Sequence, residues 1–195
     1  METIKTLNQD LQTIDICLQN MQIGVPLYYV KMELRTKEVC LEAVKYNIRN
    51  IIYVPADVMT EEMVYAAYNY VVLCRNCLTL IPEKFKTDEF YIYAIDNIET
   101  VGDIRTLLLN IPKARRTYEV CLAAVKKCGM ALLHVPKKFK TETLCMYAVA
   151  SNGLAIQYIE NPTLKMCRLA LRSNTNAKKY IDKEVLKTLS GGKAV

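Results

Sequence analysis

The fold is decided by the stretch TYEVCLAAV, residues 117–125, because its pattern recurs in phase along the chain. The six-residue block VCLAAV (120–125) has the counterparts VCLEAV (39–44), MVYAAY (63–68), FYIYAI (90–95), LCMYAV (144–149) and MCRLAL (166–171), and a decayed copy, ICLQNM (16–21). A threonine stands three residues before each of the seven copies: Thr13, Thr36, Thr60, Thr87, Thr117, Thr141 and Thr163. Such a recurrence at intervals of 22 to 30 residues is typical of a protein built from short repeats.

The pattern inside each block predicts an α-helix. The first, second, fifth and sixth positions are mostly apolar, which gives one apolar stripe along a helix. The threonine is well placed as the N-cap, and acidic residues follow it in the first turn. Alanine at the fifth position predicts a close approach between helices, where a larger side chain would overpack. The alanines are Ala43, Ala67, Ala94, Ala124, Ala148 and Ala170.

The rest of each unit predicts a turn and a second, shorter helix. The first helices are expected to end at Asn47, Cys128-Gly129, Asn152-Gly153 and Asn174, types that tolerate a left-handed cap. Apolar segments follow at 51–54, 78–81, 107–111, 131–135, 155–159 and 177–181. In four units a proline stops the second helix, and one tight turn is expected after it. These prolines, each five residues before a threonine, are Pro55, Pro82, Pro112 and Pro136.

We therefore expect an all-α fold, a solenoid-like array of about seven helical hairpins of about 24 residues each. The array would form a single domain over residues 1–195. Its units lie near 13–35, 36–59, 60–86, 87–116, 117–140, 141–162 and 163–189, and both ends are expected to act as caps. The longest interval holds residues 96–105, which predict either a lengthened loop or helix, or a bend between two sub-arrays.

Five of the eight cysteines occupy the second position of the block: Cys17, Cys40, Cys121, Cys145 and Cys167. Stacked helices lie about 8 to 10 Å apart, whereas a disulfide needs Cα atoms within about 7 Å. We therefore expect buried, unpaired thiols, which suit a reducing cytosol. The sequence has no apolar run of the ~18 residues that a membrane helix needs, and its start lacks the features of a secretory signal. These features predict a soluble cytoplasmic protein without a membrane span.

The two halves of the chain carry opposite charge. Residues 1–100 contain 9 Lys and Arg against 14 Asp and Glu, a net charge of −5, whereas residues 101–195 contain 17 against 6, a net charge of +11. Because the basic residues recur at comparable phases, several are expected along one edge, where they would steer an acidic partner. Three interpretations stay open: a solvated face, a docking surface for an acidic protein, and binding of a phosphate backbone. The candidate binding residues are Lys113, Arg115, Arg116, Lys126, Lys127, Lys137, Lys138 and Lys140, followed later in the chain by Lys178, Lys179, Lys183 and Lys187.

No pattern in the sequence predicts catalysis, a metal site or a cofactor. Cys74 and Cys77 form a lone CxxC, and no second pair or paired histidine completes the four ligands of a zinc site. His134 is the only histidine, and neither GxGxxG nor GxxxxGK[ST] occurs. We predict a protein that is not an enzyme and that needs neither cofactor nor metal, with packing as the simplest role of the CxxC.

The consensus also resembles a known family. A threonine, two residues, an apolar-Cys-Leu-x-Ala-Val block and an aliphatic helix ending in Val-Pro are similar to short helical repeats known only as a domain of unknown function. Residues 118–159 carry this resemblance best, and it extends over about 150 residues, with departures at Asn20, in the expanded middle and at Pro162, which directly precedes Thr163. Such repeats occur in proteins of intracellular bacteria and of viruses, including bacteriophages. The resemblance implies an interaction or effector role and brings no catalytic residues.

Three functional hypotheses follow. The first is a module that binds a protein with an acidic surface and blocks it sterically, as a viral or bacterial effector would inhibit a host protein. The alternative is a nucleic-acid-binding module that uses the basic second half, although aromatic residues are not interleaved with the basic runs. The third is self-assembly into a homo-oligomer, in which the acidic half of one copy meets the basic half of another.

Overall fold

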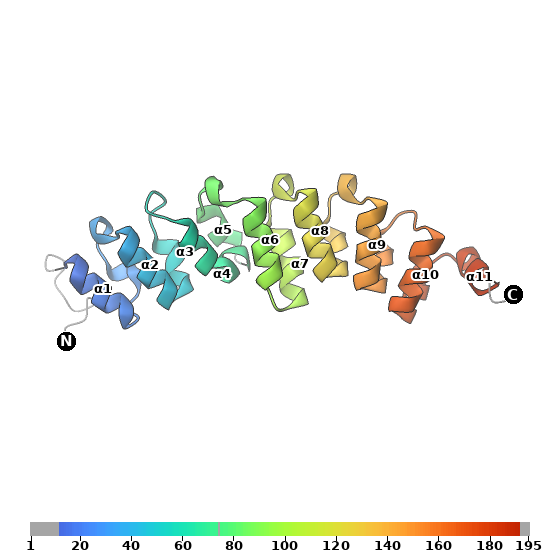
Figure 1. Cartoon of the computed structure of the whole chain (residues 1–195), viewed down its shortest axis with the longest axis horizontal. Coiled ribbons are helices and arrows are strands. Elements are labelled where there is room, and N and C mark those ends of the chain that lie inside the picture. Colours follow the sequence, from blue (N-terminus) through green and yellow to red (C-terminus); the bar gives the residue numbers. More distant parts are fainter. Residues whose placement is uncertain (1–11, 74, 192–195) are drawn as a thin grey trace. The chain divides into compact units, whose positions relative to one another are not determined.

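The computed structural model describes residues 12–73 and 75–191, and all regular structure in these two ranges is helical, with no strand (Figure 1). Contacts between Cα atoms group the chain into two compact units, Met1–Phe90 and Tyr91–Val195. The α-helices that begin in the first unit are α1 (Ile14–Gln22), α2 (Lys37–Tyr46), α3 (Glu61–Ala66), α4 (Tyr68–Leu73), α5 (Arg75–Leu80) and α6 (Asp88–Asn97). Those of the second unit are α7 (Val101–Asn110), α8 (Tyr118–Lys127), α9 (Glu142–Ser151), α10 (Leu164–Ser173) and α11 (Lys183–Gly191). The prediction of an all-α protein is confirmed for the described residues.

Each of the seven threonines caps a helix, as predicted from the sequence. The Thr117 Oγ1 accepts a hydrogen bond from the Val120 amide at 3.4 Å, and the Thr163 Oγ1 accepts one from the Met166 amide at 3.3 Å. The same bond to the amide three residues later forms at Thr13, Thr36, Thr60, Thr87 and Thr141. Because one such cap is worth about 1 kcal/mol, the seven together fix where the helices begin.

The apolar stripe of each block faces the core. All six alanines of the fifth position are at most 1% exposed, and the cysteines of the second position are at most 3% exposed. Cys17, Cys40, Cys145 and Cys167 are unpaired thiols, as predicted. Burial raises the pKa of the Cys40 thiol to about 11, which keeps it protonated and unreactive at neutral pH. Cys77 is buried as well, whereas Cys74, the other half of the CxxC, lies outside the described residues.

The second, shorter helix predicted for each unit is a 3₁₀ helix in four units. These helices are η4 (Ile48–Tyr53), η7 (Gly129–His134), η9 (Gly153–Tyr158) and η10 (Thr175–Tyr180). Six residues make two tight turns of 3₁₀ helix, and this geometry suits short connecting pieces. The single turn predicted after the prolines is also 3₁₀, in η5 (Glu83–Phe85), η6 (Lys113–Arg115) and η8 (Lys137–Phe139), and two further 3₁₀ turns, η2 (Leu27–Tyr29) and η3 (Met32–Leu34), follow α1.

The expected left-handed helix caps are wrong. Asn47, Cys128, Asn152 and Asn174 all adopt an extended backbone, with φ between −138° and −154°, and among the described residues only Gly24 has a positive φ. The side chains of the three asparagines instead cap the 3₁₀ helix that follows each of them. The Asn152 Oδ1, for example, accepts a hydrogen bond from the Leu154 amide at 3.0 Å at the start of η9. The asparagines are therefore selected as N-caps of the 3₁₀ helices.

Glycine follows two of these caps because the next repeat approaches its backbone closely. A Cβ atom built on Gly129 would lie 2.2 Å from the Ala148 carbonyl oxygen, and one on Gly153 would lie 2.3 Å from the Ala170 carbonyl oxygen. The Gly153 amide also donates to the Ser173 Oγ at 3.1 Å. Each contact joins the 3₁₀ helix of one unit to the buried alanine of the next. The close approach predicted at the alanines is confirmed at these two junctions.

The extra residues of the long middle interval form a helix. Residues 101–105 begin α7, whose N-cap Thr100 accepts a hydrogen bond from the Asp103 amide, so α7 takes the place that a 3₁₀ helix takes in the following units. The structure thus shows a helix in this interval, and the alternative of a bend between two sub-arrays stays a prediction. The unit before it is also more helical than its neighbours, since α3, α4 and α5 follow one another closely.

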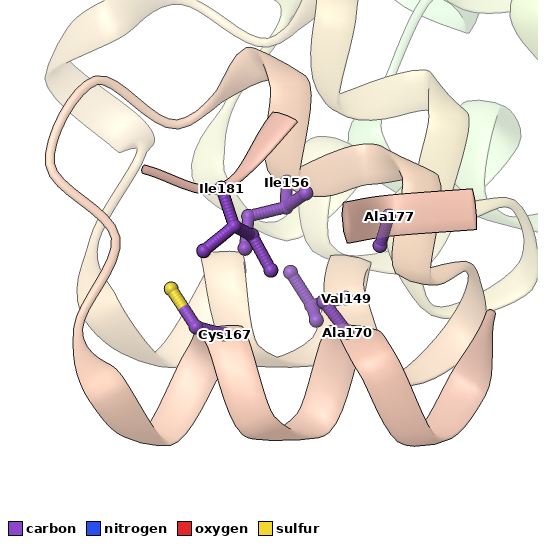
Figure 2. Packing of buried hydrophobic residues seen from close by; sticks show 6 residues of the cluster. All are labelled: Val149, Ile156, Cys167, Ala170, Ala177 and Ile181. Atoms are coloured by element: carbon purple, nitrogen blue, oxygen red, sulfur yellow. The ribbon is translucent and has the colours of Figure 1, made fainter. Parts of the chain in front are cut away.

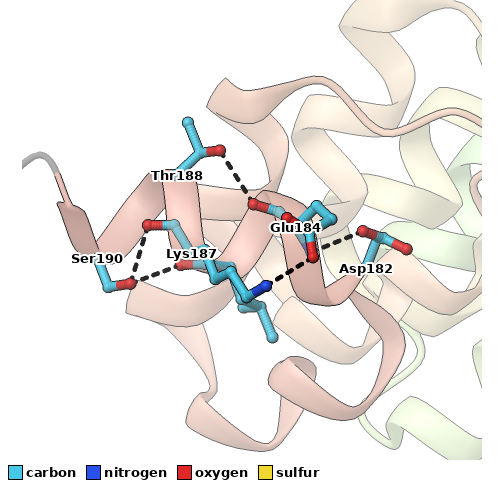
Figure 3. Close-up of polar contacts among 6 residues, drawn as sticks. Asp182, Glu184, Lys187, Thr188 and Ser190 are labelled. Carbon is cyan, nitrogen blue, oxygen red and sulfur yellow. Dashed lines mark hydrogen bonds and ion pairs between the residues drawn. The ribbon is translucent and has the colours of Figure 1, made fainter.

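The last helix, α11, was not predicted from the sequence, and it follows the seventh repeat at the end of the second unit. Asp182 replaces the usual threonine: its Oδ1 accepts from the Glu184 amide at 2.8 Å, and Figure 3 shows this bond with those of Lys187, Thr188 and Ser190 along α11. Figure 2 shows the core that α11 covers, formed by Val149, Ile156, Cys167, Ala170, Ala177 and Ile181. Val185, Leu186 and Leu189 of α11 pack against it. The helix therefore shields the apolar side of the last complete repeat.

Candidate interaction surface

Arg116, one of the predicted binding residues, is part of the scaffold. It is 9% exposed and uses its guanidinium to hold three backbone carbonyls. Its Nε donates to the Ile111 oxygen at 2.9 Å, its Nη1 to the His134 oxygen at 3.0 Å and its Nη2 to the Leu109 oxygen at 3.1 Å. Because a charged donor that loses these partners would be buried without compensation, Arg116 is held in place by the fold.

We call this set of three guanidinium-to-carbonyl hydrogen bonds an arginine brace, and the same brace recurs in the first compact unit. Arg35 donates from Nε to the Val30 oxygen, from Nη1 to the Tyr53 oxygen and from Nη2 to the Tyr28 oxygen. The sequence offsets are the same for both arginines. The Nε acceptor lies five residues before the arginine, the Nη1 acceptor eighteen residues after it and the Nη2 acceptor seven residues before it. Lys140 repeats the longest of these links, since its Nζ donates to the Tyr158 oxygen at 3.1 Å. In these three units the basic residue directly before the capping threonine therefore links two successive units, whereas Lys86 bonds to Glu83 in its own unit.

Lys127 is also engaged with the backbone. Its Nζ donates to the Ile95 oxygen at 2.8 Å and contacts the Asp96 oxygen, both in the last turn of α6. A cation at this position stabilises the negative end of the helix dipole. Together with Arg116 and Lys140, Lys127 is thus one of three predicted binding residues whose charged group is bonded to the protein's own carbonyls.

The remaining candidates lie at the two opposite ends of the helices. Lys113 and Arg115 are exposed in η6, and Lys137 and Lys138 are exposed in η8, which precedes α9. Lys126 lies at the far end of α8, and a helix of ten residues is about 15 Å long. The structure therefore does not gather the eight residues on one edge.

Lys137 and Lys138 border a depression of about 580 Å³ between η8 and the start of α10. Lys137 forms an ion pair with Glu160 at 2.6 Å, and this pair lowers the pKa of the Glu160 carboxyl. The Nζ of Lys138 lies 4.7 Å from the ring centroid of its neighbour Phe139. Because the charge of Lys137 is already compensated, this depression has only a weak attraction for an added anion.

A different surface, which the sequence interpretation did not identify, lies on the outer face of α9 and α10. Here the two helices lie side by side (Figure 1) and leave a groove of about 490 Å³. We call it the α9–α10 groove; it is lined by Glu142, Thr143, Met146, Tyr147, Ala150, Lys165 and Leu169. Tyr147 is 43% exposed, and the Nζ of Lys126 lies 5.0 Å from its ring centroid.

Two features of the sequence indicate the scaffold role of Arg116 and Lys140 and the position of the α9–α10 groove. A basic residue stands directly before four of the threonines, and its fixed position relates it to the repeat, not to a partner. The third and fourth positions of the block, which face outward, vary from Leu122 and Ala123 to Met146 and Tyr147 and then to Arg168 and Leu169. Positions that vary while the buried ones stay constant are the ones free to form a binding surface.

His134, the single histidine of the sequence, is partly buried. Burial lowers the pKa of its imidazole, and the charges of Arg105 and Arg116 lower it further, so the ring is neutral at pH 7. Within residues 12–73 and 75–191, no three His, Cys, Asp or Glu side chains lie together as metal ligands would. In the same residues no helix combines the length and the apolar character needed to cross a bilayer.

Comparison with known families gives a match over part of the chain. Residues 117–165 match the family described as Domain of unknown function (DUF4116). The matched stretch contains α8, η7, η8, α9 and η9 and ends just after Thr163, the N-cap of α10. This match confirms the resemblance seen in the sequence. Comparisons of the chain with curated proteins and with solved structures found no match.

Proposed function

We propose that this chain is a non-enzymatic helical-repeat module of solenoid-like construction that binds a protein and acts by covering part of its surface. The observation that carries the proposal is the α9–α10 groove, where Met146, Tyr147 and Leu169 form an apolar floor beside exposed cations. Apolar and aromatic centres with a polar rim are typical of protein interfaces. Rigid helical repeats suit this role because they hold such a surface without an ordering cost on binding.

The solenoid-like construction is supported by the repetition of contacts at fixed sequence offsets. Arg35 and Arg116 bind carbonyls at the same three offsets, and the glycine-to-serine link between Gly129 and Ser151 recurs between Gly153 and Ser173. In the second compact unit, α8 contacts α9 and α9 contacts α10. Units that contact mainly their neighbours are characteristic of solenoids.

The family resemblance favours a role as an effector in the cytoplasm of a host or producing cell, where the module would block a host protein sterically. The basic second half favours a partner with an acidic surface. No specific observation favours nucleic acid over protein, because the basic residues at η6, η8 and α8 form no continuous track and several are bonded to backbone carbonyls.

Photo-crosslinking from the proposed surface tests this function. A photoreactive phenylalanine analogue at Tyr147 should crosslink to a defined polypeptide in cytosol of the native source. The same analogue at Tyr180 is the control, because Tyr180 is similarly exposed, at 47% against 43%, but lies in η10 away from the groove. Equal crosslinking from both positions, or adducts from Tyr147 that nuclease removes, would contradict a protein-binding surface at this groove.

A further inference from the structure

The α9–α10 groove has dimensions suited to one helical segment. Its walls, α9 and α10, each contain ten residues and are therefore about 15 Å long, which matches nearly three turns of a bound helix. The floor is formed by Met146, Tyr147, Ala150 and Leu169. A bound amphipathic helix places side chains into such a groove at i, i+3, i+4 and i+7 spacing. Methionine in the floor adapts to side chains of different shape.

The exposed cations of α10, of which Lys165 lines this groove, lack acidic partners. Lys165, Arg168 and Arg172 are exposed on α10, and their spacing of three and seven residues places them on one side of the helix. In the described part of the chain none of these three forms an ion pair, and α10 has no acidic residue in its first turn. Glu142, the carboxylate in the lining, lies in the first turn of α9, where the helix dipole compensates it.

At the corresponding junction in the first compact unit, between α2 and α3, the cation is paired with carboxylates. Counted from the capping threonines, Lys45 and Glu62 occupy the positions that Ala150 and Lys165 occupy at the α9–α10 groove. The Lys45 Nζ lies 3.2 Å from a Glu62 oxygen, an ion pair that bridges α2 and α3, and 3.9 Å from a Glu42 oxygen within α2. At the α9–α10 groove alanine replaces lysine and lysine replaces glutamate. This exchange opens the groove and leaves its positive charge unmatched.

We infer that the α9–α10 groove binds an acidic amphipathic α-helix of a partner protein, with the apolar face of that helix on Met146, Tyr147 and Leu169 and its carboxylates on Lys165, Arg168 and Arg172. This inference rests on the function proposed above and specifies the partner of the same surface. Carboxylates bind arginine with two parallel hydrogen bonds, which makes Arg168 and Arg172 selective for acidic side chains. Lys126, stacked on the Tyr147 ring, adds a fourth cation at the neighbouring helix.

A peptide display library tests the inference with a defined probe. The peptides have about 15 residues, with leucines fixed at i, i+3, i+4 and i+7 and the remaining positions drawn from Glu, Lys and Gln. Against the full chain, selection should enrich peptides with Glu at the rim positions. The enriched peptides should bind the double variant Lys165→Glu/Arg168→Glu at least about tenfold more weakly at low salt. Tyr147→Ser should weaken binding without changing its dependence on salt.

The matched control is Lys113→Glu/Lys179→Glu, which reverses the same number of exposed charges at η6 and η10. It should leave peptide affinity within about twofold, since neither lysine belongs to the lining of the groove. Thermal melting of each variant checks that the fold is kept. Enrichment of neutral or basic peptides, no enrichment at all, or equal loss of affinity in both double variants would overturn the inference. If crosslinking from Tyr147 still captured a polypeptide in that case, the proposed function would stand and the acidic helix would be wrong as its ligand.

Discussion

Replacing Gly153 by alanine should destabilise the protein, although Gly→Ala exchanges at compatible positions usually stabilise. The Cβ of alanine would lie 2.3 Å from the Ala170 carbonyl oxygen and 3.0 Å from the Asn174 nitrogen. Both atoms belong to the backbone at the end of α10, so neither can rotate away as a flexible side chain would. The two repeats must separate at this junction to accommodate one methyl group.

The expected loss is about 2 kcal/mol of unfolding free energy. Overpacking by one group costs about 1 to 3 kcal/mol, and the displaced hydrogen bond from the Gly153 amide to the Ser173 Oγ contributes about 0.5 to 1.5 kcal/mol. The lower backbone entropy of alanine in the unfolded chain offsets about 0.4 to 1 kcal/mol. For a protein of this size the melting temperature should fall by about 4 to 8 °C.

Urea denaturation followed by circular dichroism measures this change as a lower midpoint. Gly102→Ala is the matched control, because a Cβ on Gly102 meets no atom within 4 Å and this residue lies inside α7. It should raise stability by up to about 1 kcal/mol, as helix propensity predicts. If Gly153→Ala proved as stable as Gly102→Ala, the close approach of η9 to α10 would be refuted as a source of stability.

Three further predictions follow from the core and the braces. Ala148→Leu should lower the free energy of unfolding by about 1 to 3 kcal/mol, whereas Lys138→Leu at the exposed η8 should change it by less than about 0.5 kcal/mol. Equal midpoints of the two variants in urea would show that Ala148 is not a tight contact. Arg116→Ala should lower the free energy of unfolding by at least about 2 kcal/mol because three carbonyls lose a charged donor. Arg116→Lys should recover only part of this loss because lysine cannot reach all three carbonyls, and full recovery in thermal melts would contradict the proposed role of Arg116. Because burial raises the pKa of the Cys40 thiol from an ordinary value of 9.0 to about 11, its contribution to folding stability is present below pH 9 and is lost as the pH rises toward 11. The stability measured over this range should fall more steeply in wild type than in Cys40→Ala, and parallel curves would argue against this titration.

Sequence periodicity predicted the helix starts because their cause is local. A threonine hydroxyl that caps the amide three residues later depends only on the neighbouring backbone, and all seven caps form. The buried alanines and cysteines were predictable for a related reason, since an apolar stripe must face a core. The tight turns after Pro82, Pro112 and Pro136 likewise follow from the fixed φ of proline.

The rest depended on contacts between repeats, which composition and spacing do not record. Asn152 and Gly153 form a dipeptide typical of a left-handed turn, yet the backbone is extended because the asparagine caps η9 and the glycine makes room for Ala170. Arg116 and Lys140 were predicted to bind a partner because their charge was visible in the sequence and their carbonyl acceptors were not. The α9–α10 groove could not be predicted from one helix, since its floor combines residues of two.

The brace made by Arg116 has a consequence for how this architecture can change. Its acceptors are main-chain oxygens, which every amino acid supplies, so the following unit keeps its anchor whatever side chains it displays outward. Attachment and recognition are thereby assigned to separate atoms. A lineage of such proteins can exchange the exposed residues of one unit for those that fit a new target without rebuilding the joint that holds the unit in place.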